Sequence, residues 1–91
     1  MLFRSVLGED FSGDRYVQLC AEAGVDARVL RVDDRPTTRK SRFIAHSQQV
    51  LRVDHETIEP ISPALQKRLD RTVRREAERC EAAVIPDYHK G

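Results

Sequence analysis

PTTRKSRFIAHSQQVLRVDHE, residues 36–56, predicts two strands joined by a short polar turn at His46 and Ser47. Branched and aromatic side chains suit a pleated, half-buried surface, and they occur on both sides of this turn. Successive side chains of a strand alternate between its two faces. Alternation groups Lys40 with Arg42 on the first strand. On the second strand it groups Gln48, Val50, Arg52 and Asp54 on one face, and Gln49, Leu51, Val53 and His55 on the other.

Cations and amides that project from a rigid hairpin can hold a polyol or a phosphate. Lys and Arg supply charge and hydrogen-bond donors, and each Gln adds one acceptor and two donors. Most charged side chains on strands are only solvated. From the pattern alone, a solvated hairpin whose charges serve solubility therefore stays open as an alternative.

The same stretch resembles the lid segment of the ribokinase-type (PfkB) sugar kinases. It is most similar to the branch of heptose 7-phosphate kinases that make precursors of ADP-heptose, which carries PT-x-x-K-x-R and then QQ-x-x-R-x-D. A second match, to DY-x-KG, covers residues 87–91, and a weaker match to G-x-D-x-x-G covers Gly8, Asp10 and Gly13. The residues that fall on the lid pattern are Pro36, Thr37, Lys40, Arg42, Gln48, Gln49, Arg52 and Asp54.

This resemblance implies an α/β chain, a partial ribokinase-like sugar kinase domain over residues 1–91. Parallel core strands with crossover helices would carry an antiparallel lid hairpin at about 36–56. The intact family transfers the γ-phosphoryl group of ATP to a sugar hydroxyl, with Mg²⁺ and an Asp base, by positioning and charge neutralisation. By resemblance, the residues that cover or border the sugar phosphate are Lys40, Arg42, Gln48, Gln49, Arg52, Asp87 and Lys90.

The family's catalytic base and anion hole lie on a later G-A-G-D stretch, which this sequence does not contain. The four glycines, at 8, 13, 24 and 91, form no glycine-rich phosphate loop. We therefore name no catalytic residue, and we expect ATP and Mg²⁺ to be used by the intact family and not by this chain alone. Pro86 and His89 also depart from the family pattern around its DY-x-KG turn.

The rest of the chain predicts helices alternating with strands, as in an α/β layer. Gly24 is expected to end the first helix in the left-handed conformation, and Pro63 suits the first turn of the second helix. The expected elements are a buried strand over 2–7, a helix capped by Ser12 and running to about Ala23, an extended run over 25–32, a helix capped by Ser62 and running to about Cys80, and a final strand over 82–85.

Composition limits the classes of function. At 91 residues the chain forms at most one domain with a thin core. Its net charge of +1 gives no global attraction to nucleic acid or membrane, and no apolar run approaches the ~20 residues of a spanning helix. The two cysteines, Cys20 and Cys80, lie on apolar helical stripes, where we expect small buried hydrophobic residues. A reduced cytoplasmic protein without a signal peptide is the simplest expectation.

Two further groups of residues could bind a ligand, but each has a simpler interpretation as solvated surface. The basic run 67–79 could bind nucleic acid, but acids interrupt it and no aromatic residue accompanies it, which favours a solvated helix face. His46, His55 and His89 share no metal-ligand spacing and are expected on the surface. Expected partners are a sugar phosphate, the missing kinase half, or a second copy through exposed strands. A non-catalytic interaction module and a truncated remnant remain the alternatives.

Overall fold

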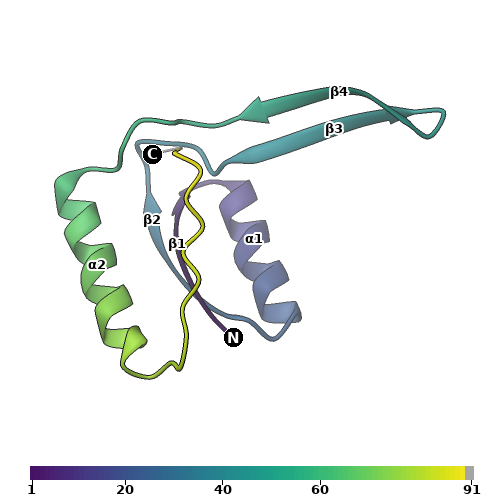
Figure 1. Cartoon of the computed structure of the whole chain (residues 1–91). Helices are drawn as coiled ribbons and strands as arrows, with labels where there is room; N and C mark the ends of the chain where they lie inside the picture. The colour runs from purple at the N-terminus through teal and green to yellow at the C-terminus, as the bar shows by residue number, and fades with distance from the viewer. Residues whose placement is uncertain (90–91) are drawn as a thin grey trace.

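The computed structural model of the chain describes residues 1–89 (Figure 1). Two helices, a two-stranded parallel sheet and a two-stranded antiparallel hairpin make up this part of the chain, which confirms the α/β class. In chain order the elements are β1 (Leu2–Gly8), α1 (Phe11–Glu22), β2 (Asp26–Val32), β3 (Arg39–Ala45), β4 (Gln48–His55) and α2 (Pro63–Ala77).

Strands β1 and β2 pair in parallel from Leu2 opposite Asp26 to Gly8 opposite Val32. Parallel strands need a crossover between them, and α1 supplies it. The expectation of parallel core strands joined by a crossover helix is therefore confirmed. The carboxyl ends of both strands meet at one edge of this sheet, and the hairpin leaves from that edge (Figure 1).

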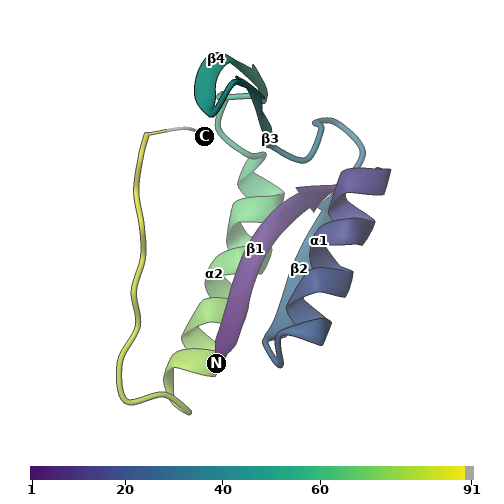
Figure 2. The ribbon, with the colours of Figure 1, turned by 90° about the vertical axis from the view of Figure 1, so that its right-hand side faces the viewer.

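The two helices cover opposite faces of this sheet. Phe3 contacts Tyr16 of α1, with ring centroids 5.7 Å apart, whereas its neighbour Arg4 pairs with Glu76 of α2 at 3.2 Å. Neighbouring side chains of a strand point to opposite faces, so α1 and α2 lie on opposite sides. Figures 1 and 2 show the sheet between the two helices in both views.

The core is thin, as expected for a short chain. Within residues 1–89 the only hydrophobic side chains that are buried are those of Leu7 and Leu65, and none is fully enclosed. Two residues with polar or charged side chains, Thr37 and Glu76, are as buried as these leucines. Polar contacts such as Arg4–Glu76 and Thr37–Gly8 therefore help to join the elements.

Helix α1 does not begin as predicted. Its N-cap is Asp10 and not Ser12, because the Asp10 carboxylate accepts a hydrogen bond from the backbone N–H of Gly13. Asp and Ser are both strong N-caps, so sequence preference alone did not separate them. At the other end, Gly24 adopts a φ of 73°, and this confirms the expected left-handed stop.

Helix α2 begins as predicted but ends early. The Ser62 hydroxyl accepts from the N–H of Leu65, and Pro63 occupies the first turn. The helix ends at Ala77 instead of near Cys80, where the N–H of Cys80 bonds only three residues back, to Ala77. Cys80 is therefore exposed rather than buried as predicted, whereas Cys20 on α1 is half-buried.

The predicted final strand over 82–85 is wrong. Residues 80–88 have no regular structure, and Val84 and Ile85 are 91% and 78% exposed. A strand is stable only when a neighbour satisfies its backbone groups, and in residues 1–89 β1 pairs with β2 alone. Figure 2 shows the segment running up one side of the molecule, apart from β1.

Strands β3 and β4 form the predicted hairpin, with His46 and Ser47 at its turn. Both turn residues have positive φ, 51° and 64°, which matches the primed turns that suit the twist of two-residue hairpins. The hairpin extends well beyond the layered body (Figure 1). Within residues 1–89 it forms its own sheet, separate from β1 and β2.

Candidate functional site

Three of the predicted binding cations gather on one face of the hairpin. Lys40 lies opposite Asp54, and Arg42 lies opposite Arg52. Residues directly opposite in an antiparallel pair share a face, and Lys40 and Arg42 share one by alternation. We call Lys40, Arg42 and Arg52 the cation face of the hairpin. The structure thus brings these three predicted residues together.

Two acids organise part of this face. Asp54 lies 3.0 Å from the Lys40 ammonium and 3.1 Å from the Arg52 guanidinium. Glu56 lies 3.8 Å from Lys40. Asp54 therefore holds two cations in place, a role that its position in the sequence pattern did not reveal.

Arg42 differs from the other two cations. In the part of the chain that the structure describes, it makes no ion pair or hydrogen bond, and it is exposed. Like charges placed directly opposite each other on a sheet destabilise it, yet Arg42 faces Arg52. An anion held between the two guanidinium groups would relieve this repulsion.

The two glutamines are arranged differently from the prediction. An irregularity between Phe43 and Ile44 leaves Val50 without an opposite residue, so Gln49 lies opposite Ile44 and Gln48 opposite Ala45. This bulge breaks the expected alternation. Because Ile44 shares the side of Arg42, the register puts Gln49, and not Gln48, on the cation face. Bulges re-aim side chains in this way.

Asp87 is one of the two residues that the sequence pattern adds to the site from the end of the chain. Asp87 lies in the irregular segment after α2, where its carboxylate accepts a hydrogen bond from the N–H of His89 at 2.9 Å. No hydrogen bond or ion pair joins Asp87 to the hairpin within residues 1–89. Lys90 lies outside the described residues.

The base of the hairpin is tied to the sheet by Thr37. Its hydroxyl accepts from the N–H of Gly8 at 2.9 Å, and its own N–H donates to the Asp10 carboxylate at 2.8 Å. The other oxygen of that carboxylate accepts from the N–H of Gly13. The three residues of the weak G-x-D-x-x-G match therefore meet Thr37, a contact that sequence reasoning missed.

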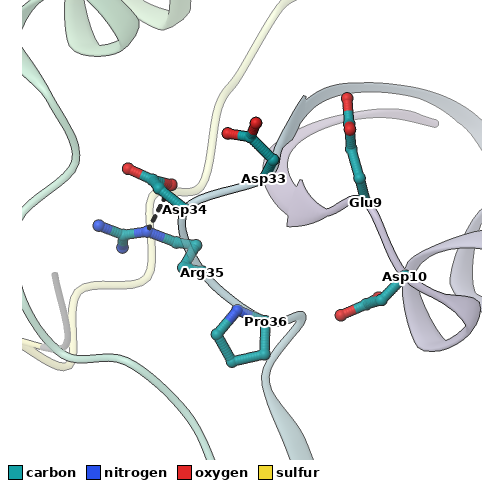
Figure 3. A pocket seen from close by; sticks show the side chains of 6 residues that line it. All are labelled: Glu9, Asp10, Asp33, Asp34, Arg35 and Pro36. Carbon is teal, nitrogen blue, oxygen red and sulfur yellow. Dashed lines mark ion pairs between the residues drawn. The ribbon is translucent and has the colours of Figure 1, made fainter.

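A hollow of about 360 Å³ opens beside this junction, at the carboxyl ends of β1 and β2. Figure 3 shows the four carboxylates and the arginine that line it with Pro36. The Arg35 guanidinium lies 3.9 Å from Asp34, and another of its nitrogens donates to the carbonyl of Pro60. The lining residues are Glu9, Asp10, Asp33, Asp34, Arg35 and Pro36.

Two carboxylates that join separate elements have shifted pKa values. The hydrogen bond from the Thr37 backbone, with others from the Thr37 hydroxyl and Gly13, holds the pKa of Asp10 below its ordinary 3.8. The hydrogen-bonding guanidinium of Arg4 holds the pKa of Glu76 below its ordinary 4.5, although burial opposes this. Both carboxylates therefore favour the folded state only while they are ionised.

Acid should consequently destabilise the chain. A group whose pKa is lower in the folded state contributes stability above its unfolded pKa, and that contribution disappears as the pH falls through the folded pKa. We expect the urea midpoint to be constant above about pH 5.5 and to decrease below about pH 4.5. The Asp10→Asn/Glu76→Gln variant should show a flatter profile, and an equally steep decrease in this variant would contradict the assignment.

Residues 1–89 contain no group of three His, Cys, Asp or Glu side chains placed to hold a metal ion. Neither helix in this part of the chain combines the length and apolar content needed to cross a bilayer.

Nearly the whole chain is similar to part of a longer bacterial protein. It is 38% identical over 87 residues to the bifunctional protein HldE of Wolinella succinogenes, with 94% of this chain and 18% of that protein covered. Identity is 40% over 88 residues to the protein of the same name from Mesorhizobium japonicum, and 33% over 87 residues to that from Helicobacter pylori. The chain spans about a fifth of the length of these relatives. No protein-family model matches it.

Proposed function

We propose that this chain is the lid-bearing part of a ribokinase-type sugar kinase and that its hairpin covers a sugar phosphate, with heptose 7-phosphate as the favoured ligand. The intact family, with ATP and Mg²⁺, supplies the phosphoryl transfer, and the rest of the kinase would be a partner of this part. The similarity to segments of HldE proteins supports this proposal.

The observation that carries the proposal is the pair Arg42 and Arg52, which face each other on the hairpin. Arg42 has no anionic partner among residues 1–89, and Lys40 projects on the same side about 6.6 Å along the strand. Guanidinium groups bind phosphate through two parallel hydrogen bonds. A phosphate placed there would neutralise the repulsion between the arginines.

Each remaining member of the predicted site has a place in this proposal. Gln49, on the cation face, would offer its amide to sugar hydroxyls, while Gln48 lies beside the turn on the other face. Asp87 and Lys90 would border the sugar phosphate, as the resemblance to the family implies. The base that deprotonates the sugar hydroxyl is not among the described residues.

A ligand titration tests the lid. Heptose 7-phosphate and unphosphorylated heptose are titrated separately against the full chain, and backbone amide shifts are followed by NMR. We expect the phosphorylated sugar to shift amides of β3 and β4, and the unphosphorylated sugar to bind much more weakly. Shifts confined to the basic residues 67–79 of the α2 region would contradict the proposal, because that helix would then be the anion site.

The opposite face of the hairpin favours a second role, in association. Phe43, Leu51 and Val53 remain 55%, 54% and 47% exposed, and Phe43 lies opposite Leu51. Exposed apolar surface of this kind marks an interaction site. We propose that a second copy of the chain covers this face, so that the hairpin acts as both lid and dimer contact.

Sedimentation tests this association. The full chain should show a dimer whose population increases with protein concentration, because burial of these side chains is worth about 25 cal/mol per Å². The Leu51→Gln variant should sediment as a monomer, whereas Val84→Gln, in the irregular terminal segment, should not change the association. A monodisperse monomer for the unaltered chain would exclude the dimer.

A further inference from the structure

The connection between the sheet and the hairpin is built from specific contacts rather than a free linker. Thr37 lies two residues before β3. Its hydroxyl and its backbone N–H both form hydrogen bonds with the loop between β1 and α1. Gly8 N–H donates to the Thr37 hydroxyl, and Thr37 N–H donates to Asp10. Thr37 is one of the few buried residues in the range 1–89, at 7% exposure.

Two glycines allow this close approach. A Cβ atom on Gly8 would lie 2.6 Å from the carbonyl oxygen of Arg35 and 2.7 Å from the nitrogen of Thr37. A Cβ atom on Gly13 would lie 2.9 Å from the Thr37 hydroxyl. The segment that enters β3 is therefore pressed directly against the loop between β1 and α1.

Arg31 and Arg35 hold the two sides of this junction. Arg31 donates to the carbonyl of Gly8 at 3.0 Å and pairs with Asp14 at 2.8 Å, which fixes the loop against β2. Arg35 donates to the carbonyl of Pro60 at 3.1 Å, which ties the chain entering the hairpin to the chain leaving it. Asp10 is the central member, since its two oxygens join α1 to Thr37.

We propose that Asp10 is a positioning residue for the hairpin: its carboxylate fixes Thr37 and so sets the orientation of Lys40, Arg42 and Arg52 relative to the sheet. Its effect on ligand binding rests on the proposed function, whereas its effect on orientation does not. Asp10 acts through Thr37 and is not assigned a contact with the sugar.

The conservative variant Asp10→Asn separates capping from positioning. Asn and Asp are equally good N-caps, so the side-chain oxygen of the introduced asparagine can still accept from Gly13 and preserve α1. In the asparagine, an NH₂ group replaces the carboxylate oxygen that accepts a hydrogen bond from the N–H of Thr37. This NH₂ group cannot accept that hydrogen bond. Asp10→Ser retains the cap and removes the second oxygen, and it provides a second test if the asparagine variant does not fold.

The first readout needs no ligand. Residual dipolar couplings of the backbone amides report whether the hairpin and the β1–β2 sheet keep one fixed relative orientation. In the unaltered chain one alignment tensor should fit β1, β2, β3 and β4 together. In Asp10→Asn and Asp10→Ser, the hairpin couplings should shrink while those of β1, β2 and α1 stay the same. Glu9→Gln, which alters the exposed acid next to Asp10, is the matched control and should resemble the unaltered chain.

The second readout is the dissociation constant for heptose 7-phosphate. If the hairpin is correctly oriented in only a tenth of the molecules, the apparent affinity falls about tenfold. Unchanged couplings in both Asp10 variants would overturn the positioning role. Absence of binding by the unaltered chain, with the couplings still lost in the variants, would overturn the lid function and leave the positioning role supported.

Discussion

Replacing Arg4 with methionine should strongly lower the urea midpoint of the chain, because one partner of an enclosed ion pair is lost. Arg4 is enclosed between β1 and α2, with its side chain only 7% exposed. Its guanidinium faces Glu76 at 3.2 Å and donates to the carbonyl of Asp26 at 2.8 Å. Removal of one partner leaves a carboxylate enclosed without its main counter-charge, and this is the costly outcome for a buried pair.

Urea unfolding monitored by circular dichroism measures the effect. Arg28→Met is the matched control, because Arg28 reaches the same Glu76 at 3.7 Å but is 63% exposed, and exposed pairs contribute about 0–1 kcal/mol. The double variant Arg4→Met/Glu76→Leu should recover part of the loss, since apolar groups can replace a buried pair. Equal midpoints for Arg4→Met and Arg28→Met would show that the pair does not anchor α2.

Replacing Arg42 with lysine should weaken the binding of heptose 7-phosphate about tenfold or more, although the charge is kept. Lysine cannot present the planar pair of donors that a guanidinium offers to phosphate. Arg42 is the member of the cation face with no partner in the described residues, so its donors are available to a ligand.

The matched control is Arg39→Lys. Arg39 lies on the same strand but opposite His55, on the other face of the hairpin, so this change should leave the affinity within about twofold. Isothermal titration calorimetry with both variants provides the comparison. Equal losses in the two variants would point to general electrostatic attraction, and no loss in Arg42→Lys would remove this residue from the site.

The hairpin was predictable because its signals are local. Alternating branched residues and a two-residue polar break specify the pairing of β3 with β4 and place Lys40 beside Arg42. The bulge at Val50 was not predictable, since no glycine or proline marks it, and it exchanged the faces of Gln48 and Gln49. A single extra residue in one strand is enough to reverse such an assignment.

Long-range polar contacts were the main features that the sequence did not reveal. The pattern of the basic run 67–79 favours solvated acids, but Glu76 faces the sheet because its partner Arg4, far away in the chain, lies there. Asp10 belongs to the weak G-x-D-x-x-G match, but its contact with Thr37 depends on the path of the chain between β2 and β3. In the terminal segment 82–85 the local signal is misleading. Its composition is typical of a strand, but it has no pairing partner within residues 1–89 and stays irregular.

The junction at Asp10 also implies an order of events as the chain folds. Strands β3 and β4 are joined by two residues, and such hairpins form within about 1–10 μs. The parallel pairing of β1 with β2 joins residues 24 positions apart. Such pairing is slow, because the chain loses loop-closure entropy before the non-local contacts form. The bond between Thr37 and Asp10 spans 27 positions and needs both units in place. The hairpin should therefore form first, without a fixed orientation relative to the rest of the chain. Its orientation becomes fixed only when the β1–β2 sheet has formed and Thr37 can bond to Asp10.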